Sequence, residues 1–392
     1  MARLGDVFPL VRNGASIKQT DGAAGIPITR IETISNREID RNKFGYADII
    51  DDSKYKDYIL QDGDILMSHI NSEKHLGKVA LYKKQGNEQI IHGMNLLMLR
   101  ANPSVLFPPF AIYFFETSAF LLQIKKITKK SVNQASFTVK SLKEVEIPLP
   151  PIDEQRKIAA VLDKVSDLIA KRKQQLDKLD ELVKSRFIEM FGNLATNSKG
   201  WEETTVGKEC FYIKDGPHKS LHDIGKENGG HPFISVRNIV NHAIDFTTAK
   251  YISDEDYADA IKKCHPEKGD MLYSKGGTTG IAKLIDIDEK FANWVHVAVL
   301  KFDKDKLNGL FFENMLNSDY CYGQSQRLTK GIANRDLVLS AIAQIKMYRP
   351  PMQLQNEFSD FVVKTDKSKL AIQESLKRLE ILKKSLMQKY FG

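Results

Sequence analysis

Two stretches of the chain carry hydrophobic residues at alternating steps of three and four positions. This spacing is the heptad pattern of a helix that packs lengthwise on another helix. Basic residues interrupt the pattern at Arg172, Arg186, Lys369 and Lys383, where polar side chains help to set the register. The remaining seam positions are Leu162, Val165, Ile169, Leu176, Leu179, Val183, Met190, Ile372, Leu376, Leu379, Leu386 and Tyr390. We therefore predict two long helices that form an antiparallel coiled coil.

Both helical stretches have the same boundaries. A Pro-Pro pair precedes each of them, at 150–151 and 350–351, and disfavours helix upstream. A Phe-Gly pair closes each of them, at 191–192 and 391–392, where glycine can adopt the left-handed conformation of a helix cap. About 38 helical residues form a rod roughly 57 Å long.

The two stretches are copies of each other at a constant offset of 200 residues, in which Gln155 matches Gln355 and Ser185 matches Ser385. The similarity continues upstream with small drifts of the offset. IPITRIETISNREID at 26–40 is similar to HPFISVRNIVNHAID at 231–245, GDILMS at 63–68 to GDMLYS at 269–274, and ITKKSVN at 127–133 to LTKGIAN at 328–334. The chain is therefore a tandem repeat of one module of about 190 to 200 residues.

The non-helical part of each module has the pattern of a mixed α/β domain rich in strands. Short apolar runs bounded by Gly, Asn and Asp predict strands at 65–67, 78–82, 95–99 and 296–300. The stretches 109–126 and 308–327 predict helices that close each domain. We expect four segments: globular domains at 1–151 and 193–351, and helices at 152–192 and 352–392.

Composition agrees with a folded protein of two or three domains, because 42% of the 392 residues are hydrophobic and 28% charged. The formal charge of +8 suits a polyanionic partner, but it is spread thinly along the chain, so a nucleic-acid site must be a local face. The three cysteines lie more than 50 residues apart, which fits a reducing cytosol. Without a signal-peptide pattern or a long apolar run, we expect a soluble, cytoplasmic protein with no membrane partner.

Motifs of catalysis are missing or incomplete. No phosphate-binding GxxxxGK[ST] loop is present, and Phe107-Pro108-Pro109-Phe110 has phenylalanine where an amine-methylating site needs a polar residue. An acidic set of Asp270, Asp288 and Glu289 has no equivalent in the first copy, and surface turns explain it better. His218 and His222 lack further ligands nearby. We expect no catalytic residue, no cofactor and no metal in this chain.

Basic and amide side chains recur at the same point of each copy, just before the long helix. Lysine and arginine contact phosphates, and asparagine, glutamine and arginine read base edges. The loop 274–280 adds Gly-rich backbone, and its counterpart at 68–74 is polar. The candidate DNA-binding residues are Lys125, Lys126, Lys129, Lys130, Asn133, Gln134, His69 and Asn71 in the first copy, and Lys275, Thr278, Arg327, Lys330, Asn334 and Arg335 in the second. A solvated charged face and a flexible turn are the alternative interpretations.

The segment IPLPPIDEQRKIA at 147–159, the tandem globular domains and the two long helices together resemble the specificity subunit of type I restriction-modification systems. The second copy departs from this motif at 352–357, and there the similarity depends on the offset of 200. The resemblance implies that each globular part is a target recognition domain, which reads one half of a bipartite, asymmetric sequence in double-stranded DNA. It also implies that the helices set the spacing between the halves.

The resemblance implies partners as well. Two modification subunits would dock on the helices, bind S-adenosylmethionine and methylate adenine, and restriction subunits that use ATP and Mg²⁺ can join them. The chain itself would be non-catalytic. Two alternatives are a self-sufficient DNA methyltransferase or nuclease, and a coiled-coil scaffold that binds DNA without sequence preference.

Overall fold

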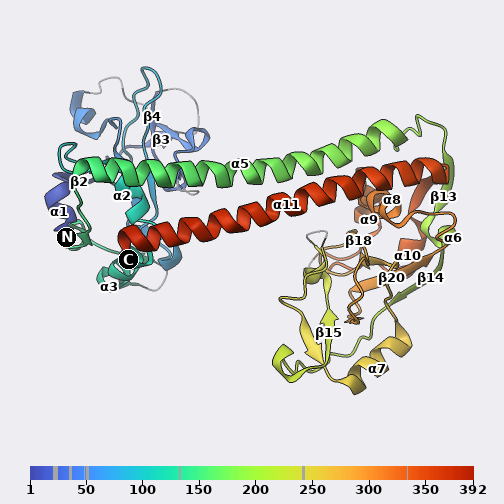
Figure 1. Ribbon diagram of the computed structural model, residues 1–392. Coiled ribbons are helices and arrows are strands. Elements are labelled where there is room, and N and C mark those ends of the chain that lie inside the picture. Colours follow the sequence, from blue (N-terminus) through green and yellow to red (C-terminus); the bar gives the residue numbers. More distant parts are fainter. Residues whose placement is uncertain are drawn as a thin grey trace. The chain divides into compact units, whose positions relative to one another are not determined.

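The computed structural model describes residues 1–392 except 21–24, 35–37, 48, 50–52, 132–133, 241–242 and 333. It is a mixed α/β protein with two helices of 40 residues, α5 (Ile152–Phe191) and α11 (Met352–Phe391) (Figure 1). The chain forms two compact units. Unit 1 comprises Met1–Lys173 and Glu374–Gly392, and unit 2 comprises Gln174–Gln373. Each unit thus combines one globular part with a piece of both long helices, and the four predicted segments stay a prediction.

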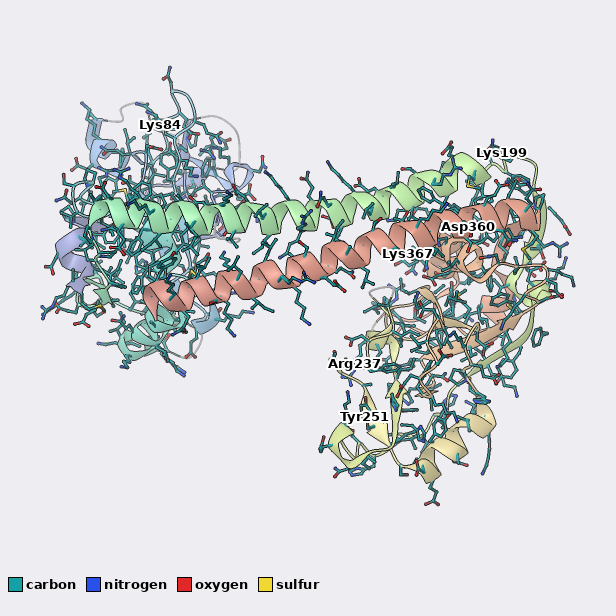
Figure 2. The ribbon with its side chains drawn as sticks, viewed as in Figure 1. Lys84, Lys199, Arg237, Tyr251, Asp360 and Lys367 are labelled. Atoms are coloured by element: carbon teal, nitrogen blue, oxygen red, sulfur yellow. The ribbon has the colours of Figure 1, made fainter. Side chains whose placement is uncertain are left out.

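The predicted limits of the long helices are confirmed. Both helices begin directly after a Pro-Pro pair and end at the phenylalanine of a Phe-Gly pair. Gly192 has a φ of +78°, the left-handed conformation expected of a residue that ends a helix. The predicted seam side chains are buried or half-buried, whereas residues such as Asp360 and Lys367 on other faces of α11 are exposed (Figure 2).

In unit 1 the beginning of α5 packs with the end of α11, so the two helices are antiparallel there. Leu162 is fully buried and belongs to the same hydrophobic core as Phe391. The rings of Phe110 and Phe391 lie 5.0 Å apart, which joins the globular part to α11. Lys173 of α5 forms an ion pair of 3.7 Å with Glu380 of α11.

Unit 2 repeats this arrangement with the other ends of the helices. The rings of Phe187 on α5 and Phe358 on α11 lie 5.3 Å apart in an edge-to-face contact. The basic seam residue Lys369 forms an ion pair of 2.7 Å with Asp180 of α5. Desolvation works against this ammonium, but hydrogen bonding to Asp180 and the charge of Asp366 raise the pKa of Lys369 above its ordinary value.

Each unit contains a four-stranded antiparallel sheet with the same strand order. In unit 1 the order is β2 (Leu10–Asn13), β9 (Leu96–Arg100), β6 (Ile65–Ser68) and β8 (Val79–Leu81). In unit 2 it is β14 (Cys210–Asp215), β20 (Val297–Phe302), β17 (Met271–Ser274) and β18 (Ala282–Leu284). The common topology extends the sequence repeat from the helices to the globular parts.

A second, three-stranded sheet lies beside the first in each unit. Its order is β3 (Gln19–Thr20), β5 (Gly45–Ala47), β4 (Ile26–Ile28) in unit 1, and β16 (Lys250–Ile252), β15 (His231–Ile234), β19 (Ala292–Asn293) in unit 2. Shorter elements outside these sheets are β1 (Ala2–Arg3), α1 (Leu4–Val7), α4 (Val139–Lys143), β12 (Glu146–Ile147), β13 (Glu202–Thr205), α6 (Val206–Glu209), α7 (Asp254–Lys263), α10 (Leu339–Gln344) and β21 (Lys346–Arg349).

The helices that close each globular part differ from the prediction, because each predicted stretch holds two helices. Unit 1 has α2 (Pro108–Phe114) and α3 (Ser118–Ile127), and unit 2 has α8 (Gly309–Asn317) and α9 (Asp319–Leu328). The breaks fall at Thr117 and Ser318. Their hydroxyls accept hydrogen bonds from backbone N–H groups of the following helix, so each begins a new helix as its N-cap.

The matched glutamines of the repeat connect each long helix to its globular part. The amide of Gln155 accepts a hydrogen bond from the Phe107 N–H (2.9 Å) and donates to the carbonyl oxygens of Val105 (2.9 Å) and Pro150 (2.8 Å). Gln355 makes the same three bonds with Asn308, Lys306 and Pro350, at 2.9, 3.1 and 2.8 Å. Both side chains are fully buried, so each bond satisfies a backbone group that is shielded from water.

Candidate nucleic-acid interface

The predicted residues of the first copy gather on a small sheet in unit 1. Its strands are β10 (Lys129–Lys130), β11 (Ala135–Ser136) and β7 (Ile70–Asn71), in this order. Lys129 pairs with Ser136, and Ala135 pairs with Asn71. A loop that is distant in sequence therefore joins the basic hairpin. We call residues 129–136 the first hairpin.

The first hairpin presents cations and an amide to solvent. Lys129, Lys130 and Gln134 are exposed, and so are Lys125 and Lys126 in the last turn of α3. Lys130 forms an ion pair of 2.8 Å with Glu73, an exposed contact that contributes little to stability. Asn133 lies outside the described residues. This surface has the chemistry to contact phosphates and base edges.

Unit 2 has an equivalent hairpin, residues 330–336, which we call the second hairpin. Lys330 and Asp336 exchange two backbone hydrogen bonds of 2.9 Å, and Gly276 forms a bridge with Asp336. The exposed side chains on or beside this hairpin are Thr278, Arg327, Lys330, Asn334 and Arg335. Arg335 donates hydrogen bonds to Thr279 (3.4 Å) and to Gln326. The structure thus brings most of the predicted residues of each copy to one hairpin.

His69 and Lys275 occupy matching places under the hairpins. The backbone N–H of Phe137 bonds to the carbonyl oxygen of His69 (3.2 Å), and that of Leu337 bonds to Lys275 (2.7 Å). Both residues are only 5% exposed. The Lys275 ammonium lies 3.0 Å from Asp336 and 3.5 Å from Asp215. These two side chains therefore support the hairpins from inside, and contact with a phosphate does not fit their burial.

A second buried histidine in unit 1 makes the stability of this unit depend on pH. Burial lowers the pKa of His92 from 6.5 to about 4. Between these values the unfolded chain binds a proton that the folded chain does not bind, so stability falls as the pH falls, by at most about 1.4 kcal/mol per pH unit. We expect His92→Asn to make the thermal unfolding of unit 1 less sensitive to pH in this window.

Asparagine is the residue that unit 2 has at the matching position, Asn293, which is also buried. Thermal scans of the full chain at several pH values from 4 to 6.5, followed by hydrogen exchange of unit 1 peptides, test the expectation. The exposed His218→Asn is the control and should leave the pH dependence unchanged. An identical pH dependence of the wild type and His92→Asn would contradict the assignment.

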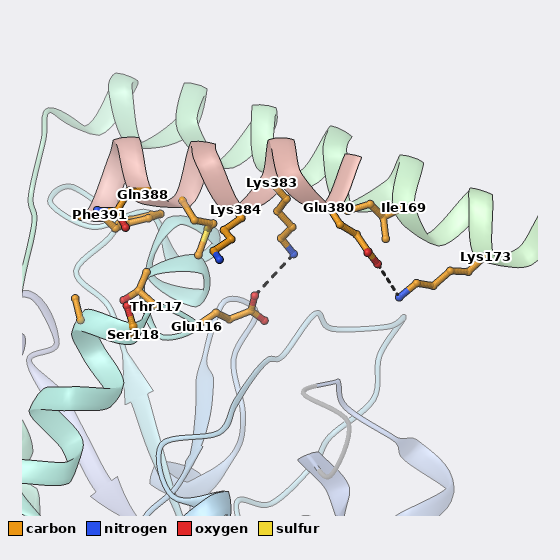
Figure 3. Close-up of a pocket in the computed structure, with 13 residues that line it drawn as sticks. Glu116, Thr117, Ser118, Ile169, Lys173, Glu380, Lys383, Lys384, Gln388 and Phe391 are labelled. Carbon is orange, nitrogen blue, oxygen red and sulfur yellow. Dashed lines mark ion pairs between the residues drawn. The ribbon is translucent and has the colours of Figure 1, made fainter. Parts of the chain in front are cut away.

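Unit 1 also has a cleft of about 520 Å³ beside the end of α11 (Figure 3). Side chains from the start of α3, from α5 and from the last turns of α11 line it. Two ion pairs cross it, Lys383 with Glu116 (3.8 Å) and Lys173 with Glu380 (3.7 Å). Because these pairs neutralise most of the charge, the cleft is not part of the basic surface of the first hairpin.

The acidic residues that a metal nuclease would need are held by basic side chains. Asp270 contacts the Lys301 ammonium at 2.7 Å, and at the same place in unit 1 Asp64 contacts Arg100 at 2.7 Å. The first copy does therefore have a counterpart of Asp270, and in both units this carboxylate also accepts a bond from a backbone N–H of the preceding turn. Within the described part of the chain, no three His, Cys, Asp or Glu side chains are grouped so that they could hold a metal ion.

Sequence reasoning overlooked two features of this region. Gln155 and Gln355 were matched, but their bonds to three separated backbone groups depend on the folded chain. Ile332, at the tip of the second hairpin, is fully exposed and was not among the predicted residues. The available signal was the apolar pair Ile332-Ala333 between Gly331 and Asn334. Among the residues that the structure covers, no helix is both long and apolar enough to cross a membrane.

Comparison with known proteins identifies the family. Residues 1–181 and 198–382 each match the type I restriction modification DNA specificity domain. The chain is 30% identical to the putative type I restriction enzyme MjaX specificity subunit of Methanocaldococcus jannaschii, over 98% of this chain and 90% of that protein. It is 27% identical to the type I restriction enzyme EcoKI specificity subunit of Escherichia coli, over 41% of this chain and 34% of that protein. The chain belongs to the family of type I restriction-modification specificity subunits.

Solved structures agree with this fold. The S subunit of a type I restriction-modification system from M. genitalium has a TM-score of 0.59 at 16% identity, and the match covers 100% of this chain and 95% of that one. A chain solved in work on complex assembly and conformational transition of the type I R-M system has a TM-score of 0.55 at 17% identity, over 100% and 96% of the two chains. At such identities the likeness concerns the fold alone.

Proposed function

We propose that this chain is the sequence-reading, non-catalytic subunit of a type I restriction-modification complex. Each globular part reads one half of a bipartite DNA target, with the first and second hairpins at the DNA. The observation that carries the proposal is the repeated hairpin. In unit 1 the hairpin pairs as a small sheet with β7, and in unit 2 it forms a bridge with the loop at Gly276. In both units it covers a buried side chain, but its exposed residues differ. Family membership supports the same reading, and neither alternative, a self-sufficient enzyme or a scaffold without sequence preference, has a comparable observation in its favour.

The difference between the two hairpins implies an asymmetric target. Lys129, Lys130 and Gln134 stand on the first hairpin, whereas Lys330, Asn334 and Arg335 stand on the second. Because direct readout depends on which donors and acceptors reach the base edges, different side chains select different bases. Two related domains with unlike hairpins should therefore recognise two unlike blocks of sequence.

The long helices are suited to set the distance between these blocks. A helix of 40 residues is about 60 Å long, and half-sites read from one face of B-DNA lie about 34 to 36 Å apart. The same helices leave exposed faces on which two modification subunits can dock. We assign S-adenosylmethionine to these partners, and ATP and Mg²⁺ to restriction subunits where they are present. The modest charge of the chain implies that binding is weak without partners that enclose the duplex.

Selection from random duplexes tests the proposal. The full chain, reconstituted with its modification subunits, should enrich two fixed blocks of bases separated by a gap of constant length. A single continuous motif, or no motif, would exclude the proposed function. Methylation by the purified chain alone with S-adenosylmethionine would support the self-sufficient enzyme, and equal affinity for all duplexes at matched salt would support the scaffold.

The first hairpin should affect one half of the target only. We expect Lys129→Ala combined with Lys130→Ala to lower affinity for the full target several-fold and to reduce the salt dependence of binding, because two phosphate contacts are lost. Base changes in the block read by unit 2 should lower the affinity of the variant by the same factor as that of the wild type. Lys84→Ala with Lys199→Ala, two exposed lysines that belong to neither hairpin, is the matched control. An equal loss at both blocks would show that the first hairpin is misassigned.

A further inference from the structure

Ile332 is the most exposed hydrophobic side chain of the described residues, with a relative exposure of 101%. It stands at the tip of the second hairpin, between the paired residues Lys330 and Asp336. An isoleucine exposed to water gains nothing from folding, since its transfer from water is favourable only when another surface covers it. Single exposed hydrophobic residues are common, so the surroundings of Ile332 decide whether it has a function.

The described residues on either side of Ile332 are constrained by glycine geometry and by hydrogen bonds. Gly331 has a φ of +83°, and a Cβ atom there would lie 2.2 Å from the backbone oxygen of Asn334, so the turn requires glycine. Below the tip, Lys330 and Asp336 exchange two backbone hydrogen bonds, and the Asp336 carboxylate is paired with the buried Lys275 ammonium at 3.0 Å. Paired residues thus fix the base of the hairpin that carries Ile332.

Three basic residues lie close to the isoleucine in the chain. Lys330 and Arg335 flank it on the hairpin, and Arg327 lies in the last turn of α9 directly before the hairpin. All three are exposed, whereas the one acidic residue of the hairpin, Asp336, is bound to Lys275. A single exposed isoleucine on a hairpin with exposed basic residues differs from the broad apolar patch of a protein interface. It matches the surface of a nucleic-acid groove, where phosphates line the rim and bases the floor.

We propose that Ile332 is a base-contacting residue of unit 2 that enters a DNA groove while the neighbouring basic residues Arg327, Lys330 and Arg335 hold the phosphates. This inference deepens the proposed function and rests on it. The aliphatic side chain can be buried against the 5-methyl group of a thymine or between two adjacent base pairs as a wedge. In both cases Ile332 contributes to specific binding and not to the general attraction of DNA. The aligned position of the first hairpin holds Ser131, so the contact belongs to one half of the target.

Binding measurements on Ile332→Ala test this proposal in the full chain with its modification subunits. For the duplex selected by the wild type, we expect the affinity to fall about tenfold, as for the loss of most of a buried aliphatic side chain. Affinity for an unrelated duplex and the salt dependence should stay unchanged, since no charge is removed. Phe211→Ala, which removes a side chain 76% exposed on β14 outside the hairpin, should have no effect.

Two modified duplexes identify the contact. If Ile332 covers a thymine methyl, replacing that thymine by uracil weakens the binding of the wild type and leaves the affinity of Ile332→Ala unchanged. If Ile332 is a wedge, it unstacks two adjacent base pairs. The fluorescence of 2-aminopurine placed at that step of the second block then rises when the wild type binds and not when the variant binds. If Ile332→Ala binds the selected duplex as tightly as the wild type, the inference about Ile332 is wrong and the proposed function is unaffected. A variant that loses modification subunits but not DNA affinity shows a protein contact and overturns it too. A wild type that selects no two-block target overturns the proposed function together with this inference.

Discussion

Removing one heptad from each long helix is expected to shorten the gap between the two recognised blocks by about three base pairs. Seven helical residues span about 10.5 Å, and one base pair of B-DNA spans about 3.4 Å. Suitable segments are 173–179 in α5 and 371–377 in α11, because a deletion of seven preserves the alternation of three and four along the seam. The bases of the blocks should not change, since both hairpins stay intact.

Selection from random duplexes measures the gap directly. The control is a deletion of the same heptad from α5 alone, which puts the seams of the two helices out of register and should abolish selective binding instead of changing the gap. An unchanged gap after the double deletion would show that the helices do not determine the spacing. Altered blocks with an unchanged gap would mean that residues of the helices read bases themselves.

Gln155→Leu is expected to destabilise unit 1 by about 3 kcal/mol, because it leaves three backbone groups without their hydrogen-bond partner. For a unit of this size that loss lowers the melting temperature by roughly 6 to 12 °C. The Phe107 amide, which now donates to the Gln155 oxygen at 2.9 Å, should lose its protection from hydrogen exchange. Gln155→Glu should not restore stability, since a carboxylate cannot donate to the carbonyl oxygens of Val105 and Pro150.

The repeat supplies a matched variant for this prediction. Gln355→Leu should leave the Phe107 amide protected and expose the Asn308 amide of unit 2. Gln174→Leu, an exposed position of α5, is the control for adding a leucine to the helix and should change neither amide. If Gln155→Leu unfolds no earlier than Gln174→Leu, the buried glutamine does not hold α5 to the globular part.

Most of the helical architecture could be predicted from the sequence because its signals are periodic or local. The seam from Leu162 to Met190 and its copy from Ile372 to Tyr390 follow from spacing alone, and the Pro-Pro and Phe-Gly pairs set the helix ends within the chain itself. The break between α2 and α3 was missed. The first helix ends at Phe114 and Thr117 caps the next, and hydrophobic residues on both sides conceal this break.

The candidate interface was predictable only in part. Exposed residues such as Lys129 and Lys330 were found because basic residues recur at the same place of each copy. Lys275 and His69 were included because they stand in polar loops, but the structure buries both. Burial of Lys275 depends on Asp215 and Asp336, which lie 60 and 61 residues away, and no local pattern indicates such a contact.

The sequence by itself determined the tandem repeat, the two long helices and the side of each helix that is covered. These properties follow from spacing and from identity between two copies of one module. Only the tertiary structure decided which basic residues face solvent, that Gln155 and Gln355 join helix to domain, and that Ile332 is fully exposed. The physical reason is that exposure and hydrogen bonding depend on groups that are distant in the chain and meet only when it folds.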